Sequence, residues 1–124
     1  MQLPTPAQSY VDAYNAKDVD RMLSCLADEV HFQNFSSGEI DAEAKGIGEF
    51  TALAKMGASA FLERQQSVTN CIVVANRVMI EVDYTAVVAT DLPNGWTAGQ
   101  TLSFRGSSYF ELENDRIMKI VDAS

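Results

Sequence analysis

Two tyrosines near the N-terminus offer phenol groups that could hydrogen-bond a ligand. Tyr10 and Tyr14 are four residues apart, in a stretch where apolar residues recur at the spacing of one helix face. Such a helix would aim both rings at the core, where they could line a cavity while a phenol reaches a bound molecule. Ordinary core packing with satisfied hydroxyls is the alternative for both residues.

A pair of carboxylates suggests acid/base chemistry at another place. Glu81 and Asp83 are two positions apart in a stretch of alternating apolar residues, so both would point to one face of a strand. That face lies opposite the apolar one and should be the outer face of a sheet. We expect Arg105, on the adjacent strand, to pair with them in a charge network at a dimer surface. If the faces were inverted, the same residues would form an acid-and-arginine catalytic group.

The single histidine and the single tryptophan are further candidates. His31 alternates with Val30 and Phe32, and strand parity turns it away from the face that carries Asn34. A surface or interface position is therefore expected for His31. Trp96 follows a turn-rich loop and could form a wall or lid over a cavity, or a dimer contact.

Metal and cofactor sites find no support in the residue pattern. Cys25 and Cys71 lie among apolar neighbours and are expected to be small buried core residues. A single histidine without a close cysteine pair cannot supply a zinc-type ligand set. The sequence also lacks a glycine-rich phosphate loop and a nucleophile elbow. We therefore expect no metal and no cofactor.

Length and composition describe one domain that covers residues 1–124. The 124 residues are 47% hydrophobic, which is enough for one continuous core. A net charge of -8 disfavours nucleic-acid backbones and anionic membranes as partners. No apolar run approaches the roughly 20 residues of a membrane-spanning helix, and the N-terminus lacks a secretory signal pattern. A cytoplasmic protein is the expectation.

Helical patterns dominate the first half of the chain. Thr5 as a hydroxyl cap and Pro6 at the first helical position predict a helix that starts at Pro6 and ends near Lys17. Asp18 can cap a second, shorter helix that reaches residue 26. The pattern then predicts a short strand over residues 30–35, an acidic loop through Glu39, Asp41 and Glu43, and a third helix over residues 47–61.

Strand patterns dominate the second half, over residues 64–75, 77–90, 100–113 and 116–122. Short asparagine turns favour antiparallel pairing of consecutive strands. In residues 77–90 the apolar positions share the face expected to meet the helices, and in residues 100–113 Ser108 is a polar residue on that inner face. Helices followed by strands predict an α+β fold, with three helices on one face of a sheet of four or five strands.

Short motifs at residues 15–20, 26–32, 45–50 and 115–117 occur in this order, and the last strand closes on Val121 and Asp122. Together they resemble the nuclear transport factor 2-like superfamily, in its SnoaL-like and ketosteroid-isomerase-like branches. The resemblance implies a cone-shaped fold with a strongly curved sheet, antiparallel but mixed at the first strand, around an apolar cavity. It also implies frequent dimerisation through the outer sheet face. Members include isomerases, dehydratases, epoxide hydrolases, polyketide cyclases and noncatalytic binding proteins.

The resemblance also implies roles for individual residues. The polarising tyrosine of ketosteroid isomerases falls on Tyr10, their base position on Asn34 and their protonated-acid position on Ser108. Because Asn34 cannot accept a proton near neutral pH, standard ketosteroid isomerase activity is disfavoured. SnoaL-like proteins commonly carry a pocket-facing aspartate on the last strand, and that position is Asp122. A solvated terminal charge is the alternative for Asp122.

We therefore expect a cofactor-independent isomerase, cyclase or dehydratase that acts on a small apolar oxygenated molecule and forms a homodimer. Asp122 would be the acid/base and Tyr10 the polarising donor. A noncatalytic binding or dimerisation module of the same fold is the alternative. Ligand contacts are expected from Tyr14, Phe32, Asn34, Trp96, Phe104, Ser108 and Phe110.

Overall fold

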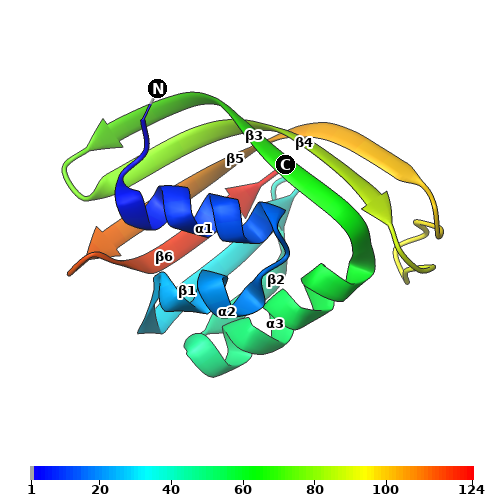
Figure 1. Cartoon of the computed structure of the whole chain (residues 1–124), viewed down its shortest axis with the longest axis horizontal. Coiled ribbons are helices and arrows are strands. Elements are labelled where there is room, and N and C mark those ends of the chain that lie inside the picture. The colour runs from blue at the N-terminus through cyan, green and yellow to red at the C-terminus, as the bar shows by residue number, and fades with distance from the viewer. Residues whose placement is uncertain (1) are drawn as a thin grey trace.

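The computed structural model describes residues 2–124 as three helices and one sheet of six strands (Figure 1). The helices are α1 (Thr5–Asn15), α2 (Val19–Ser24) and α3 (Ile47–Ala60). The strands are β1 (Leu26–Ser36), β2 (Glu39–Lys45), β3 (Phe61–Val74), β4 (Arg77–Val88), β5 (Thr101–Glu113) and β6 (Arg116–Ala123). The fold is α+β, as predicted.

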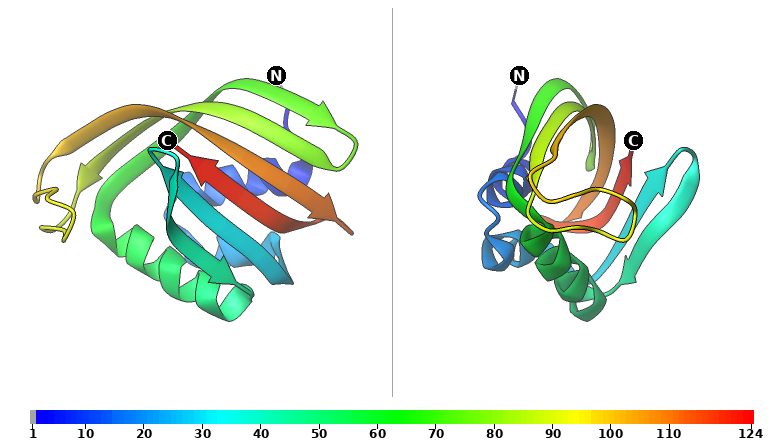
Figure 2. Two further views of the ribbon diagram at one scale, coloured as in Figure 1. Left: turned by 180° about the vertical axis from the view of Figure 1, so that it is seen from behind. Right: turned by 90° about the vertical axis from the view of Figure 1, so that its right-hand side faces the viewer.

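The sheet has the order β2-β1-β6-β5-β4-β3. β1 and β6 run parallel, and all other neighbours run antiparallel, so the sheet is mixed at the first strand as expected. Strands β3, β4 and β5 arch over the helices, while β1 and β2 close the opposite side (Figure 2). The helices cover the concave face, because α1 contacts β3 and β6 and α3 contacts β1 and β2.

Strand parity on β4 agrees with the prediction. Val78, Ile80, Val82, Tyr84, Ala86 and Val88 are all buried. On β5, Ser108 is 5% exposed and is the predicted polar residue of the inner face. Both cysteines are free, with Cys25 buried and Cys71 half-buried against the core.

The helix boundaries differ from the predicted ones by a few residues. α1 begins at Thr5, which makes no side-chain cap, because the N–H of Gln8 already donates to the carbonyl of Pro4 at 3.0 Å. α1 ends at Asn15, since Lys17 has a left-handed φ of 57°. Asp18 caps α2 as predicted, accepting a hydrogen bond from the N–H of Arg21 at 3.1 Å.

The prediction of an acidic loop after the first strand is wrong, because this segment is strand β2 on the edge of the sheet. Ala44 of β2 is buried while Glu39, Asp41 and Glu43 are exposed, so the segment alternates as a strand does. Acidic residues and alanine have low strand propensity, which obscured this alternation. The predicted count of four or five strands was too low for the same reason.

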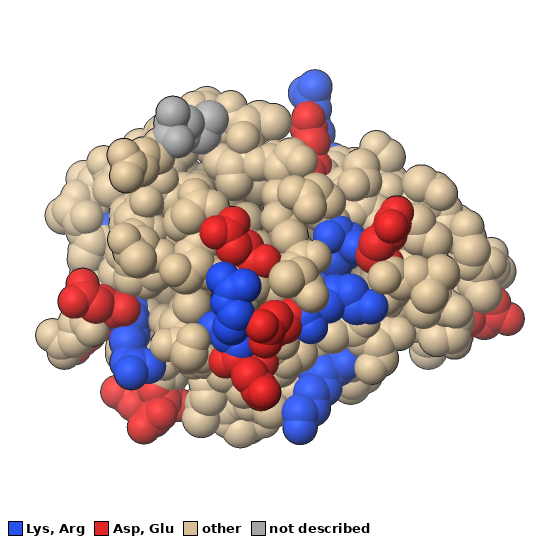
Figure 3. Space-filling view, viewed as in Figure 1, with Lys and Arg blue, Asp and Glu red and all other residues tan. Residues whose placement is uncertain are grey.

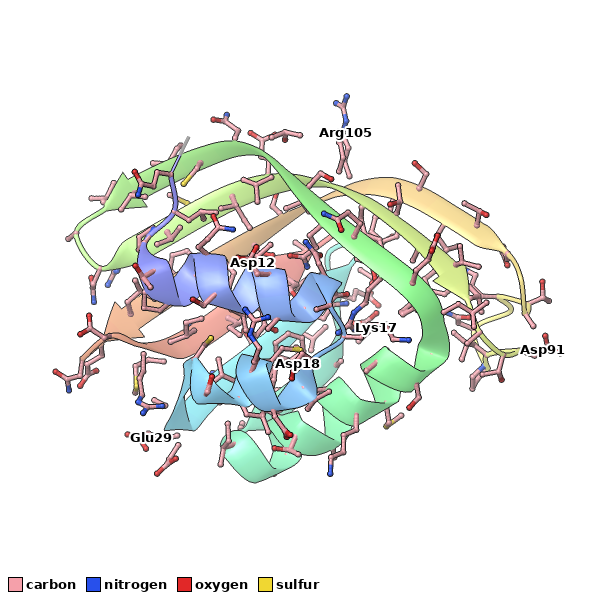
Figure 4. The ribbon with its side chains drawn as sticks, in the orientation of Figure 1. Asp12, Lys17, Asp18, Glu29, Asp91 and Arg105 are labelled. Carbon is pink, nitrogen blue, oxygen red and sulfur yellow. The ribbon has the colours of Figure 1, made fainter. Side chains whose placement is uncertain are left out.

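The convex face of the sheet carries the predicted charge pair. The Nε of Arg105 lies 3.6 Å from Asp83 Oδ1, and both side chains are exposed. Arg105 points away from the molecule (Figure 4), and Glu81 is exposed on the same strand as Asp83. Neither Arg105 nor the two carboxylates line the internal cavity described below. The alternative of an acid-and-arginine group on the inner face is therefore excluded.

The remaining surface carries mixed charge. On the face that α1 and α2 present, acidic and basic side chains lie side by side (Figure 3). His31 is partly exposed on β1, away from the cavity lining, with its Nε2 2.7 Å from Glu43 Oε2. None of the helices in residues 2–124 combines the length and the apolar character that crossing a bilayer requires.

Candidate functional site

A cavity of about 410 Å³ lies between the helices and the concave face of the sheet. This volume falls in the range of small-molecule sites. All three helices and the loop between β4 and β5 contribute to its lining, together with strands from both sides of the sheet. Aromatic rings form much of the wall, and a few polar side chains converge on the cavity.

Asp122 lies in a row of polar residues that crosses three strands. Asn34 on β1 and Ser108 on β5 stand opposite it on the two sides, and all three residues line the cavity. The hydroxyl of Ser108 donates a hydrogen bond of 2.6 Å to Asp122 Oδ1. The structure thus brings together three of the residues that the sequence singled out.

The environment of Asp122 raises its pKa from 3.8 to about 6. Loss of hydration is the main cause, because the carboxyl group is enclosed by the cavity walls although the residue keeps some exposed surface. The hydrogen bond from Ser108 acts in the opposite direction, since it favours the ionised form. Near neutral pH the carboxylate is mostly ionised but takes up a proton readily, as a general base must.

Tyr10 presents its phenol to the same cavity. Its ring is 4% exposed and packs at 5.9 Å from the ring of Phe110, which is itself buried in the core and does not line the cavity. The Tyr10 hydroxyl has no hydrogen-bond partner in residues 2–124, yet it is not sealed from the open space. Burial, and then the charge of Asp122, raise the pKa of Tyr10, so its proton stays available for donation.

The hydroxyl of Tyr14 is hydrogen-bonded to a second tyrosine. Its hydroxyl lies 2.9 Å from the hydroxyl of Tyr84, and the two rings meet edge to face with centroids 6.3 Å apart. Burial raises the pKa of both tyrosines. Tyr84 lines the cavity too, although the sequence indicated only that it faces inward.

Asp41 lies at the rim of the cavity and was missed at the level of sequence. The register between β1 and β2 slips after the pair Asn34 and Ala42, which leaves Asp41 as the extra residue of a β-bulge. Its carboxylate accepts hydrogen bonds from Asn34 Nδ2 and Ser36 Oγ, both at 2.7 Å. These hydrogen bonds lower the pKa of Asp41. The amide group of Asn34 is thus tied to the rim, with its carbonyl oxygen left for a ligand.

Aromatic side chains complete the walls. Phe32, Trp96 and Phe104 all line the cavity. Phe104 stacks on the ring of Tyr84 with centroids 4.8 Å apart, and Trp96 lies beside Phe61 at 6.4 Å. Phe104 is 39% exposed, so this part of the wall belongs to the mouth of the cavity.

Arg64 and Gln66 on β3 also line the cavity, and the sequence analysis did not single them out. Both are buried, with exposed fractions of 5% and 8%. The available signal was their parity, because they share one strand face with the apolar Val68. A charged residue at a core-facing position of a strand is unusual, which makes Arg64 a candidate for the site.

Comparison with known proteins identifies the family and the fold of the chain. The sequence matches the model of the SnoaL-like domain over residues 7–120. No curated protein matches the chain.

Several solved structures have the same fold at low sequence identity. A candidate polyketide cyclase from Xanthomonas campestris pv. campestris is 22% identical with a TM-score of 0.75, over 97% of this chain and 87% of its own. A candidate SnoaL-like polyketide cyclase from Jannaschia is 13% identical with a TM-score of 0.81, over 95% and 81%. An LEH-like epoxide hydrolase from M. tuberculosis is 14% identical with a TM-score of 0.76, over 97% and 80%.

At these identities the structural likeness establishes the fold alone. The family match is independent of it and runs from within α1 to within β6. The chain therefore belongs to the SnoaL-like domain family.

Proposed function

We propose that this protein is a cofactor-independent acid/base enzyme of the isomerase, cyclase or dehydratase type. Its substrate would be a small, largely apolar, oxygenated molecule held in the cavity. One observation carries the proposal: Asp122, with its pKa raised to about 6, lines the same cavity as Tyr10, whose hydroxyl has no hydrogen-bond partner in residues 2–124. A base and a hydrogen-bond donor on one cavity are the two groups that enolisation needs.

In the proposed reaction, the Asp122 carboxylate removes a proton from a carbon next to a carbonyl group. The electron pair of the broken C–H bond moves to the carbonyl oxygen, and Tyr10 donates a hydrogen bond to the resulting enolate. Protonated Asp122 then returns its proton. Delivery to another carbon gives isomerisation, and delivery to a leaving hydroxyl gives dehydration. If the enolate carbon attacks a second carbonyl, delivery to that oxygen gives cyclisation.

The other polar residues would orient the substrate. Ser108 holds Asp122 in place through its hydrogen bond of 2.6 Å. Asn34 is fixed by Asp41, which leaves its carbonyl oxygen to accept a hydrogen bond from a substrate hydroxyl. The rings of Phe32, Trp96 and Phe104 would supply flat apolar surface for a ring-shaped ligand.

Hydrogen exchange at carbon tests the proposal. Simple cyclic ketones, whose α-protons exchange slowly in neutral D2O without a catalyst, are incubated with the protein in D2O, and loss of the α-proton signal is followed by NMR. We expect the α-protons to exchange faster with wild type than in buffer alone. In Asp122→Asn the rate that the protein adds should fall by roughly 100-fold or more. Asp12→Asn is the matched control, because Asp12 is exposed on α1 (Figure 4). Exchange that proceeds equally well in Asp122→Asn would refute the assigned role.

A noncatalytic small-molecule-binding module is the second candidate. It is favoured by Asn34, since this amide occupies the position that resembles the base of ketosteroid isomerases and is tied to Asp41. In that case native mass spectrometry of the purified protein would detect a retained molecule, while no probe would exchange its protons.

We also propose that the protein forms a homodimer through the outer face of the sheet. Ile72, Val74 and Met79 are 54%, 61% and 44% exposed, and they lie on the adjacent strands β3 and β4. Exposed apolar side chains gathered in this way are typical of interfaces between protein chains.

A further inference from the structure

Arg64 is a buried cation that has no acidic partner among residues 2–124. It is 5% exposed and lines the cavity. In residues 2–124 the only ion pairs join Arg105 to Asp83 and His31 to Glu43. An arginine side chain keeps its charge in proteins, and a buried charge that lacks a counterion is unfavourable. We therefore expect a negatively charged group that is not part of residues 2–124 to stabilise the buried charge of Arg64.

The contacts of Arg64 hold it in place but leave donors free. Its Nε donates to the carbonyl oxygen of Tyr14 at 2.8 Å, and the guanidinium lies 3.6 Å above the ring of Tyr14. Its Nη2 meets only the sulfur of Met22, at 3.7 Å. Its Nη1 has no partner in the described residues, and no atom of the group is fully sealed without one. The terminal N–H groups of a rigid, positioned guanidinium are thus left for a ligand.

Gln66 adds a second unpartnered group beside it. The residue is 8% exposed and lines the cavity. Its backbone N–H donates to Asn15 Oδ1, but its side-chain amide group makes no hydrogen bond in the described part of the chain. Gln66 is two positions from Arg64 on β3, so the two side chains point to the same face.

The charge and shape of these groups select the ligand. A guanidinium presents its N–H groups in a plane that matches a carboxylate, and charge-assisted hydrogen bonds of this kind are strong. One cation with one amide balances a single negative charge. A phosphate dianion would leave excess negative charge in a cavity that already holds Asp122.

Building on the proposed acid/base function, we propose that Arg64 and Gln66 bind the carboxylate of the substrate, which is therefore a keto acid. Arg64 forms no ion pair with Asp122, so the two groups act on different parts of the molecule. The carboxylate lies against β3, and the ketone with its acidic C–H lies between Tyr10 and Asp122. An otherwise apolar body between the two ends contacts the aromatic walls.

The test compares two probes that differ in charge and in one methyl group, 3-benzoylpropionate and its methyl ester. Binding to the whole protein is measured by isothermal titration calorimetry with wild type, Arg64→Gln and Arg64→Lys. Arg105→Gln is the matched control, because the Arg105 side chain is 92% exposed on the outer face. We expect wild type to bind the acid more tightly than the ester by roughly tenfold or more. Arg64→Gln should remove this preference and leave ester binding unchanged, while Arg105→Gln should alter neither.

Several results would overturn the proposal. One is that wild type binds the acid and the ester with equal affinity. Another is that wild type does not bind the acid at millimolar concentration. A third is that folded Arg64→Gln loses the same affinity for both probes. If Arg64→Gln does not fold, Arg64→Lys and the comparison of probes on wild type decide the matter.

Binding measurements also test this site separately from the acid/base function. Acid-selective binding without proton exchange supports the carboxylate site alone, and exchange of neutral probes without acid selectivity supports the acid/base function alone.

Discussion

Replacing Asp122 with asparagine should make the protein more stable at neutral pH. The pKa of the carboxyl group rises from 3.8 to about 6 on folding. At about 1.4 kcal/mol per pH unit, the ionised group then costs the folded state at most about 3 kcal/mol. Asparagine carries no charge, and its side-chain oxygen can still accept the hydrogen bond from Ser108.

The sign of the pH dependence follows from the raised pKa. Below the ordinary value of 3.8, both the folded and the unfolded chain hold the Asp122 proton, and the penalty is absent. As the pH rises through about 6, the folded state must also ionise, and the favourable contribution of the protonated acid is lost. The free energy of unfolding of Asp122→Asn, relative to that of wild type, should therefore increase with pH. The increase should be about 1.4 kcal/mol between about pH 5 and about pH 8.

Urea denaturation at several pH values measures this difference. At each pH, the free energy of unfolding of wild type is subtracted from that of Asp122→Asn. This removes the contributions of the other carboxylates, which titrate in both proteins. Asp12→Asn, at an exposed position on α1, is the control for removal of a carboxylate outside the cavity. A difference for Asp122→Asn that does not vary with pH, or one that shrinks as the pH rises, would refute the assignment of a raised pKa to an enclosed carboxyl group.

Three further variants test neighbouring parts of the account. Ser108→Ala removes the hydrogen bond that lowers the pKa of Asp122, so the acidic limb of the pH–rate profile should shift to higher pH by about one unit. An unchanged profile would contradict the role of Ser108. Tyr10→Phe removes the proposed enolate donor and should lower kcat by roughly 100-fold while KM changes little; a loss confined to KM would instead indicate a packing role. Ile72→Lys places a charge on the exposed apolar face and should give a monomer by light scattering, whereas an unaltered mass would place any dimer contact elsewhere.

The order and type of most elements could be predicted from residue spacing. The alternation on β4 and the cap at Asp18 are local patterns, and local patterns are what a sequence displays directly. Strand β2 was missed because its exposed acidic residues have poor strand propensity, and its pairing with β1 depends on the rest of the sheet.

The candidate site was predictable only in part. Parity and family resemblance were enough to bring Asp122, Ser108 and Asn34 to one place. Asp41 was not predictable, because a bulge in the register turns it toward the rim. Arg64 was missed since a lone arginine in a strand is usually solvated. Only the assembled cavity reveals that it is buried and that no acidic residue in the described part of the chain pairs with it.

The most direct test of the central claim is a carbon-13 NMR titration of the Asp122 side-chain carboxyl group, assigned by comparison with Asp122→Asn. An acid enclosed between the helices and the sheet should titrate with a midpoint of about 6. A midpoint close to the ordinary aspartate value of 3.8 would mean that water reaches the carboxylate freely, and Asp122 could not then be the enclosed base of this site.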